Sequence, residues 1–176
     1  MTDVRPVVVL VGMPGAGKSS VGRTVAVRLG LPFRDSDDLV VAATGRTVAD
    51  LFAESEQAFR DAETAAVVTA LSSFSGVLAL GGGSLGSATV RAALAASQAP
   101  VVLLRAGLDT LVRRVGSART RPLLAADPAA RLATLADERG ALYAAAADIS
   151  VDTDGLGVSA VAQLVLTATV RDEVGS

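Results

Sequence analysis

The chain lacks several residue types on which enzymes and metal proteins commonly rely. Its 176 residues include no cysteine, no histidine and no tryptophan, and lysine occurs once among the 16 basic residues. Without cysteine, disulfides and thiolate metal sites are excluded. Without histidine, the chain has neither the usual general base nor the commonest metal ligand. Any side chain that accepts a proton during a reaction must therefore be a carboxylate.

The chain also lacks long apolar runs and an excess of positive charge. A net charge of −2 and a pI near 5.1 leave no basic surface for nucleic acid. The apolar stretch 158–170 is interrupted by Gln163 and is too short to span a bilayer, and the N-terminus shows no signal-peptide pattern. We therefore expect a cytoplasmic, monomeric protein with one domain, 1–176, and with neither nucleic acid nor a membrane as a partner.

The only lysine lies in a glycine-rich loop that matches a phosphate-binding motif. Residues 12–19 fit G-x-x-x-x-G-K-[ST]. Glycines let backbone N–H groups converge on an anion, and the following helix directs its positive dipole end to the same point. Lys18 would bridge the β- and γ-phosphates of a nucleotide, and Ser19 would ligate Mg²⁺. The predicted nucleotide-phosphate site comprises Gly12, Gly15, Ala16, Gly17, Lys18, Ser19 and Ser20.

The segments on either side of this loop have the pattern that the motif requires. Five consecutive apolar residues at 7–11 predict a buried strand. After the loop, Val21, Val25 and Leu29 fall at i, i+4 and i+8, which places them on one face of a helix. A strand, a glycine loop and a helix in this order favour phosphate binding over an ordinary glycine-rich turn.

Short apolar runs alternate with helical patterns along the chain. Strands are predicted at 7–11, 31–34, 77–80, 101–104 and 149–151. Helices are predicted at 18–29, 37–43, 48–53, 56–71, 88–95, 108–115, 129–146 and 158–170. This alternation predicts an α/β fold, a five-stranded parallel sheet with helices on both faces. Because ligands bind beyond the carboxyl ends of such strands, four segments should meet in one crevice, namely 12–19, 35–37, 81–83 and Arg105.

Two carboxylates follow the second predicted strand. Asp35 and Asp37 flank Ser36, and in an extended segment both would point to the same side. One could hold Mg²⁺, and the other could accept a hydrogen bond or a proton from a substrate hydroxyl. Alternatively, Ser36 or Asp37 caps the next helix, with Asp38 as an acid in its first turn. The neighbouring phosphate loop favours the chemical interpretation.

Two further clusters each have two interpretations. Arg60 and Glu63 are i, i+3 neighbours on a predicted helix. They form either a surface ion pair worth ~0–1 kcal/mol, which the sequence alone favours, or a pair in which Glu63 holds Arg60 for a substrate carboxylate. The run Gly81, Gly82 and Gly83 follows the third predicted strand. It either lets a ligand touch the backbone or forms a flexible turn.

An arginine-bearing segment follows the predicted helix that ends near Gly116. Residues 117–126 contain Arg121 next to Pro122 and show no core-forming periodicity. We predict that this segment is a lid, because an arginine brought over a γ-phosphate would neutralise charge during phosphoryl transfer. Arg113 and Arg119 are interpreted as solvated.

Together these segments resemble the shikimate kinase family, from residue 7 to about residue 151. Besides the phosphate loop, the shared motifs in chain order are D-[ST]-D at 35–37, T-G-x-[ST]-I-x-[DE]-I-F at 44–52, F-R-x-x-E at 59–63, L-G-G-G at 80–83, R-P-L-L at 121–124 and E-R-x-P-L-Y at 138–143. The chain departs from the family pattern twice. Ala141 replaces the proline of the last motif, next to Arg139. The loop 151–157 lacks the arginine or proline that many relatives carry beside the adenine.

The resemblance implies a three-layer P-loop kinase fold and phosphate transfer from ATP to the 3-hydroxyl of shikimate. Asp35 would lie at the Mg²⁺, and Asp37 would bind the ring hydroxyls and orient or deprotonate the nucleophile. The catalytic set would be Lys18, Asp37 and Arg121, and residues 37–71 would form the acceptor-binding segment. The resemblance assigns the other contacts to Arg60 and Arg139 as a clamp on the shikimate carboxylate, to Gly81, Gly82 and Gly83 as pocket lining, to Arg121 on the phosphates and to Arg114 against the adenine.

Three alternatives compete with this interpretation. A related small-molecule kinase, such as gluconate kinase, would share the phosphate loop and the size. A nucleotide-operated switch would explain the D-x-x-G at 152–155, but the chain has no asparagine for a guanine-reading N-K-x-D motif. A paralogue that only binds its ligands would be expected to lose Lys18, Asp35, Asp37 or Arg121, and all four are present.

Overall fold

The computed structural model describes residues 4–116 and 127–174, and in this part of the chain five strands form one parallel sheet. The strand order is β2-β3-β1-β4-β5. The strands are β1 (Val8–Val11), β2 (Phe33–Asp35), β3 (Val77–Ala79), β4 (Val101–Arg105) and β5 (Ile149–Asp152). Strand β1 is central, since Leu10 pairs with Ala79 on one side and with Val102 on the other. All five predicted strands and their parallel arrangement are confirmed.

The second strand begins two residues later than predicted, at Phe33. Helix α1 (Lys18–Leu29) is capped by Gly30, which has the left-handed φ of 65° that favours glycine. The N–H of Leu31 still donates to the carbonyl oxygen of Ala26. Leu31 therefore closes the end of the helix instead of starting the strand.

The helices follow the predicted pattern with small changes at their ends. They are α1 (Lys18–Leu29), α2 (Ser36–Thr44), α3 (Val48–Glu54), α4 (Glu56–Ser73), α5 (Ala88–Ser97), α6 (Leu108–Gly116), α7 (Pro128–Ala146) and α8 (Val158–Val174). A short 3₁₀ helix, η1 (Ser84–Gly86), was not predicted. The predicted lid, 117–126, lies outside the described residues. Among the residues that the structure describes, no helix is both long and apolar enough to cross a bilayer.

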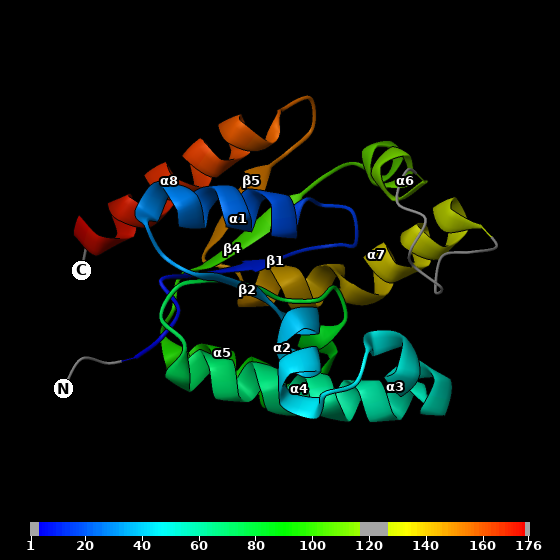
Figure 1. The fold of residues 1–176 in the computed structure, drawn as a ribbon. Helices are drawn as coiled ribbons and strands as arrows, with labels where there is room; N and C mark the ends of the chain where they lie inside the picture. Colours follow the sequence, from blue (N-terminus) through cyan, green and yellow to red (C-terminus); the bar gives the residue numbers. More distant parts are fainter. Residues whose placement is uncertain (1–3, 117–126, 175–176) are drawn as a thin grey trace.

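Helices cover both faces of the sheet. Figure 1 shows α1 and α8 on one face and α4, α5 and α7 on the other. Because side chains alternate along a strand, Val8 and Leu10 pack into the core cluster on the α1 and α8 side, whereas Val9 and Val11 pack into the cluster with α4 and α5. The unbroken apolar run of β1 is thus explained by burial on both faces.

A third, smaller core holds α2 and α3 on α4. Val40, Leu51 and Phe59 are buried together there, and the rings of Phe52 and Phe59 stack with their centroids 4.4 Å apart. This cluster lies off the sheet, so it fixes the segment after β2 by packing helix on helix (Figure 1). The position of this segment relative to the strand ends therefore depends on α4.

Two glycines inside helices provide a matched test of this packing. A Cβ added to Gly22 of α1 would lie 2.5 Å from Cε2 of Phe33 and 3.2 Å from Cδ1 of Leu10, whereas a Cβ on Gly140 of α7 would meet no atom within 4 Å. We expect Gly22→Ala to lower the free energy of unfolding by about 1–3 kcal/mol through overpacking. Gly140→Ala should raise it by about 0.5–1 kcal/mol through helix propensity. Urea unfolding of both variants measures this, and a stabilised Gly22→Ala protein would contradict the close contact of α1 with β2.

Candidate active site

The glycine-rich loop leaves β1 and turns directly into α1. Gly12, Gly15 and Gly17 have φ values of 145°, 84° and 93°, which L side chains rarely adopt. A Cβ on Gly12 would lie 2.5 Å from the carbonyl oxygen of Leu104, and one on Gly15 would lie 2.8 Å from Cγ2 of Val115. The predicted order of strand, loop and helix is confirmed, and the first turn of α1 presents its N–H groups to the loop.

Lys18 is the first residue of α1, and its ammonium group is held by the loop itself. Its Nζ donates to the carbonyl oxygens of Gly12, at 2.8 Å, and Met13, at 2.9 Å. These bonds place the cation across the loop, on the side where a phosphate would bind. Ser19 and Ser20 follow in the same helical turn, and Ala16 is buried beneath the loop.

Helix α2 begins between the two aspartates, at Ser36. Asp35 ends β2, and its Oδ1 caps α2 by accepting a hydrogen bond of 2.9 Å from the N–H of Asp38. The expectation that Asp35 and Asp37 project from one extended segment is therefore wrong. The alternative in which Ser36 or Asp37 is the cap is also wrong, whereas Asp38 does lie in the first turn. Asp37 is exposed at the carboxyl edge of the sheet, and Asp35 lies 3.9 Å from Nη2 of Arg23.

The pair of Arg60 and Glu63 is not a surface ion pair. The side chain of Glu63 is 3% exposed, and its Oε2 lies 2.8 Å from Nη1 of Arg60, whose side chain is 24% exposed. The other oxygen, Oε1, accepts hydrogen bonds from Ser84, at 2.7 Å, and Ser36, at 3.4 Å. A buried carboxylate requires hydrogen-bond donors of this kind because it has lost its contacts with water. The interpretation in which Glu63 holds the guanidinium is the one that fits this geometry.

The three glycines after β3 are closely packed and do not form a loose turn. A Cβ on Gly81 would lie 2.6 Å from Oε1 of Glu63, one on Gly82 would lie 2.9 Å from Cδ of Pro14, and one on Gly83 would lie 2.5 Å from Nη1 of Arg60. Gly81 and Gly83 thus let the backbone approach side chains of α4, and Gly82 lets it approach the phosphate loop. The run connects the phosphate loop to the arginine on α4.

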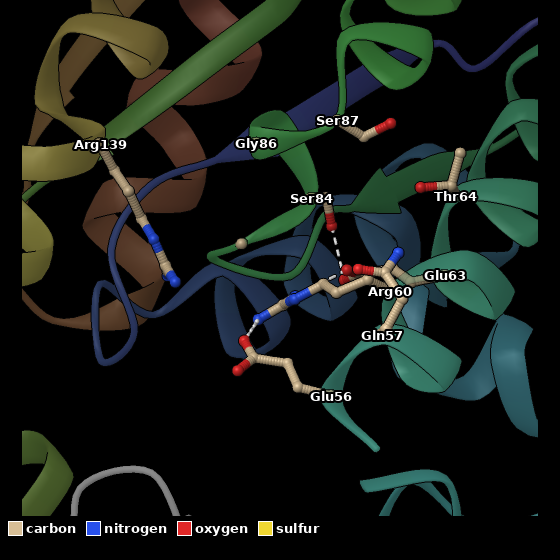
Figure 2. A pocket seen from close by; sticks show the side chains of 10 residues that line it. Glu56, Gln57, Arg60, Glu63, Thr64, Ser84, Gly86, Ser87 and Arg139 are labelled. Carbon is tan, nitrogen blue, oxygen red and sulfur yellow. Dashed lines mark hydrogen bonds and ion pairs between the residues drawn. The ribbon is translucent and has the colours of Figure 1, made fainter. Parts of the chain in front are cut away.

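Arg60 and Arg139 reach into one cavity from opposite sides (Figure 2). The cavity has a volume of about 400 Å³, within the range of small-molecule sites. Its lining residues are Glu56, Gln57, Arg60, Glu63, Thr64, Gly83, Ser84, Gly86, Ser87 and Arg139. Two guanidinium groups facing each other across a cavity are suited to an anionic group with planar acceptor geometry.

Tyr143, one turn after Arg139 on α7, joins this helix to the glycine run. Its ring is buried, and its hydroxyl donates to the carbonyl oxygen of Gly82. Burial raises the pKa of the Tyr143 phenol, so the hydroxyl keeps its proton and its role as donor. The ring of Tyr143 thus contributes to packing, and its hydroxyl contributes a hydrogen bond. This hydrogen bond fixes α7 beside the cavity. It does so although Ala141 stands where the family motif has proline.

Arg114 of α6 bridges the phosphate loop and the loop after β5. Its Nη1 donates to Oγ1 of Thr153, at 3.0 Å, and to the carbonyl oxygen of Gly15, at 3.4 Å, while its Nη2 donates to the carbonyl oxygen of Thr153, at 3.2 Å. Thr153 is buried. Nearby, the N–H of Gly107 donates to Asp154 and lowers the pKa of that carboxyl group. The loop 151–157, which lacks the family's arginine or proline, is thus held in place by the contacts of Thr153 with Arg114 of α6.

The predicted crevice is formed in part. The phosphate loop, Ser36 and the glycine run are joined by contacts at the carboxyl edge of the sheet. Arg105, the fourth expected member, lines a second cavity of about 450 Å³ between β4 and α7, which it shares with Met13 of the phosphate loop but not with the other two segments. Arg121 lies outside the described residues. The sequence interpretation missed Ser84 and Thr153 and considered Ser36 only as a cap, since no pattern marks a serine or threonine as the partner of a distant side chain.

Comparisons with known proteins agree with this geometry. The family model for shikimate kinase matches residues 14–169. A shikimate kinase from Streptomyces avermitilis is 49% identical over 164 residues, which cover 93% of this chain and 95% of that protein. Among solved structures, a shikimate kinase from Acinetobacter baumannii in complex with shikimate has a TM-score of 0.85 and 32% identity, and the match covers 96% of this chain and 94% of that chain.

The fold extends beyond these relatives. A gluconokinase from Sinorhizobium meliloti matches with a TM-score of 0.64 over 95% of this chain and 93% of that chain, at 20% identity. At this identity the match shows the fold alone. It gives no support to gluconate as the acceptor.

The contacts of Thr153 lead to a prediction about nucleotide binding. The resemblance places Arg114 against the adenine, and Thr153→Val removes one of the acceptors that hold its guanidinium while preserving the shape of the side chain. We expect the Kd for ATP to rise about 3- to 10-fold, less than the full loss of a charge-assisted hydrogen bond because the effect is indirect. Titration calorimetry with a non-hydrolysable ATP analogue measures this. Thr153→Ser keeps the hydroxyl and should bind normally, so an equal loss in both variants would argue against the role of Oγ1.

Proposed function

The chain belongs to the shikimate kinase family, and on that premise we propose that it transfers the γ-phosphoryl group of ATP to the 3-hydroxyl of shikimate, with shikimate 3-phosphate and ADP as products. The observation that carries this proposal is the pair of guanidinium groups, Arg60 and Arg139, across a cavity that adjoins the glycine run of a phosphate-loop protein. A carboxylate on a small ring satisfies two facing guanidinium groups, and it would leave the ring hydroxyls directed toward the strand ends.

The phosphate loop binds the nucleotide. The N–H groups of residues 15–20 surround the β-phosphate, and the ammonium group of Lys18 exchanges its bonds to Gly12 and Met13 for phosphate oxygens. Arg114 lies against the adenine. Arg121, from the predicted lid 117–126, adds positive charge beside the γ-phosphate.

The acceptor lies between α4, α7 and the glycine run. Arg60 and Arg139 bind its carboxylate, and Gly81, Gly82 and Gly83 allow the ring to lie against the backbone. Asp37 accepts a hydrogen bond from the 3-hydroxyl. As the hydroxyl oxygen bonds to the γ-phosphorus and the bond to the β-γ bridging oxygen breaks, the hydroxyl proton passes to Asp37. A carboxylate serves this purpose in a chain without histidine.

The residues present fit a Mg²⁺ that arrives with the nucleotide. In residues 4–116 and 127–174, no three histidine, cysteine or acidic residues are grouped closely enough to hold a metal ion. Mg²⁺ usually keeps several waters and takes its other ligands from phosphates and one or two side chains. Ser19 would supply a hydroxyl ligand, and Asp35, whose Oδ1 already caps α2, would bind a metal-bound water. The ion would neutralise part of the negative charge on the phosphates.

We further propose that the protein acts as a monomer in the cytoplasm. In support, Arg60 on α4 and Arg139 on α7 line the cavity together within one protomer. ATP, the phosphate donor, is a cytoplasmic nucleotide.

A coupled assay tests the proposed function directly. ADP release with ATP and shikimate should be rapid and should depend on both substrates, with gluconate as the control acceptor. Formation of shikimate 3-phosphate would be confirmed by phosphorus NMR. Activity with gluconate but not shikimate would favour the related small-molecule kinase. Binding of ATP and shikimate without any product would favour the paralogue that only binds its ligands.

The two aspartates should differ in a second test. Asp37→Asn preserves shape but removes a charge, so shikimate affinity should fall about 10- to 150-fold, and kcat should fall by a further ~10²–10⁴ because the proton acceptor is lost. Mg·ATP binding should hardly change. Asp35→Asn is the matched control at the other end of the segment, and it should raise the Mg²⁺ requirement while leaving shikimate binding to the nucleotide-free protein unchanged. Calorimetry of each variant with each ligand decides this, and normal turnover by Asp37→Asn would refute the proton-acceptor role.

A further inference from the structure

The buried carboxylate of Glu63 joins three separate elements. Its Oε2 binds Arg60 on α4, and its Oε1 binds Ser84 on η1 and Ser36 at the start of α2. Figure 2 shows Ser84 directed at Glu63 from the glycine side and Arg60 leaving Glu63 toward the cavity. One carboxylate therefore contacts the arginine, the glycine run and the segment that carries Asp37.

The direction of the Ser36 hydroxyl is fixed by its other partner. The N–H of Gly81 donates to Oγ of Ser36, at 2.8 Å. Because that contact uses an acceptor lone pair, the hydroxyl proton is available for Oε1 of Glu63. Ser36 is 1% exposed, so water does not replace either bond. The start of α2 is thus tied to both Glu63 and the glycine run.

Arg60 is held by several neighbouring groups. Glu63 binds Nη1, Glu56 lies 3.6 Å from Nη2, and the ring of Phe59 lies 5.1 Å from Cζ. Gly83 passes so close to the guanidinium that no side chain fits between them. Of these partners, Glu63 is the buried charge, and its own position is set by the two serine hydroxyls.

We propose that Ser84 and Ser36 are positioning residues that fix the Arg60 guanidinium through Glu63, and thereby set the distance between the carboxylate clamp and Asp37. This inference rests on the proposed function. Shikimate is a rigid ring with its carboxylate and its 3-hydroxyl at fixed positions, so the clamp and the proton acceptor must be spaced to match it. The serines supply that spacing because they hydrogen-bond to one carboxylate from η1, directly after the glycine run, and from the start of α2, the helix that carries Asp37.

The predicted consequence is a defect specific to the acceptor. Ser84→Ala removes the 2.7 Å hydrogen bond to Glu63 and leaves the bond between Ser36 and Gly81 intact. We expect kcat/KM for shikimate to fall about ten-fold, the lower end for a lost hydrogen bond to a charged group, while KM for ATP stays unchanged. Ser36→Ala should act in the same direction. Ser73→Ala, an exposed serine on α4 that donates only to its own helix, is the matched control.

A double-mutant cycle separates positioning from a general structural effect. In an Arg60→Ala background the clamp is gone, so adding Ser84→Ala should change kcat/KM for shikimate less than about two-fold. Ser84→Thr, which keeps a hydroxyl, should retain most of the activity. If Ser84→Ala does not fold, Ser84→Cys keeps the shape of the side chain with a weaker donor. Its effect on kcat/KM should likewise be present with Arg60 and absent in the Arg60→Ala background.

Two outcomes would overturn the proposal: an equal loss with and without Arg60, or no loss in the wild-type background. Both leave the proposed function intact, because the wild-type protein is assayed with shikimate in the same experiment. Failure of the wild-type protein to phosphorylate shikimate would instead reject the proposed function. The two conclusions are therefore distinguishable within one set of measurements.

Discussion

Every strand of the sheet runs in the same direction, so every segment that leaves a strand emerges at the same edge. The phosphate loop, the segment from Asp35 to Asp37 and the glycine run leave β1, β2 and β3, which are neighbours in the sheet. Backbone pairing thus brings together segments that lie far apart in the chain, such as those of Gly12 and Gly83. The helices then determine how closely these segments approach, since α4 and α7 supply the arginines from outside the sheet.

The parts of the fold that repeat a pattern could be predicted from the sequence. The apolar run of β1, the glycine loop and the spacing of Val21 and Val25 place α1 at its observed bounds. The ends of other elements were less predictable, because they depend on single bonds such as the one from Leu31 to Ala26. The 3₁₀ helix after Gly83 has no periodic pattern and was missed.

The site could be predicted as a set of segments, and its internal contacts could not. A spacing of three residues on a helix indicates that Arg60 and Glu63 are neighbours, but it does not reveal that Ser84 and Ser36 cover Glu63. The surface interpretation failed because burial is decided by segments distant in sequence. The family resemblance assigned Arg60 to a carboxylate clamp, which stays a prediction, and the reason why its side chain reaches a cavity emerged only from the fold. Similarly, Asp35 proved to be a helix cap because α2 starts one residue earlier than the pattern indicated.

The hydrogen bonds of Lys18 to its own loop have a consequence for selectivity. An incoming anion does not meet a solvated ammonium group, since two carbonyl oxygens already occupy that cation. In the proposed function, phosphate oxygens replace these two carbonyl oxygens as partners of Lys18, so the loss of two hydrogen bonds reduces the net gain from binding an anion. A singly charged ion such as chloride gains little, whereas a polyphosphate gains from the lysine and the loop N–H groups together. On this proposal, the loop favours a polyphosphate over a singly charged anion without any steric barrier.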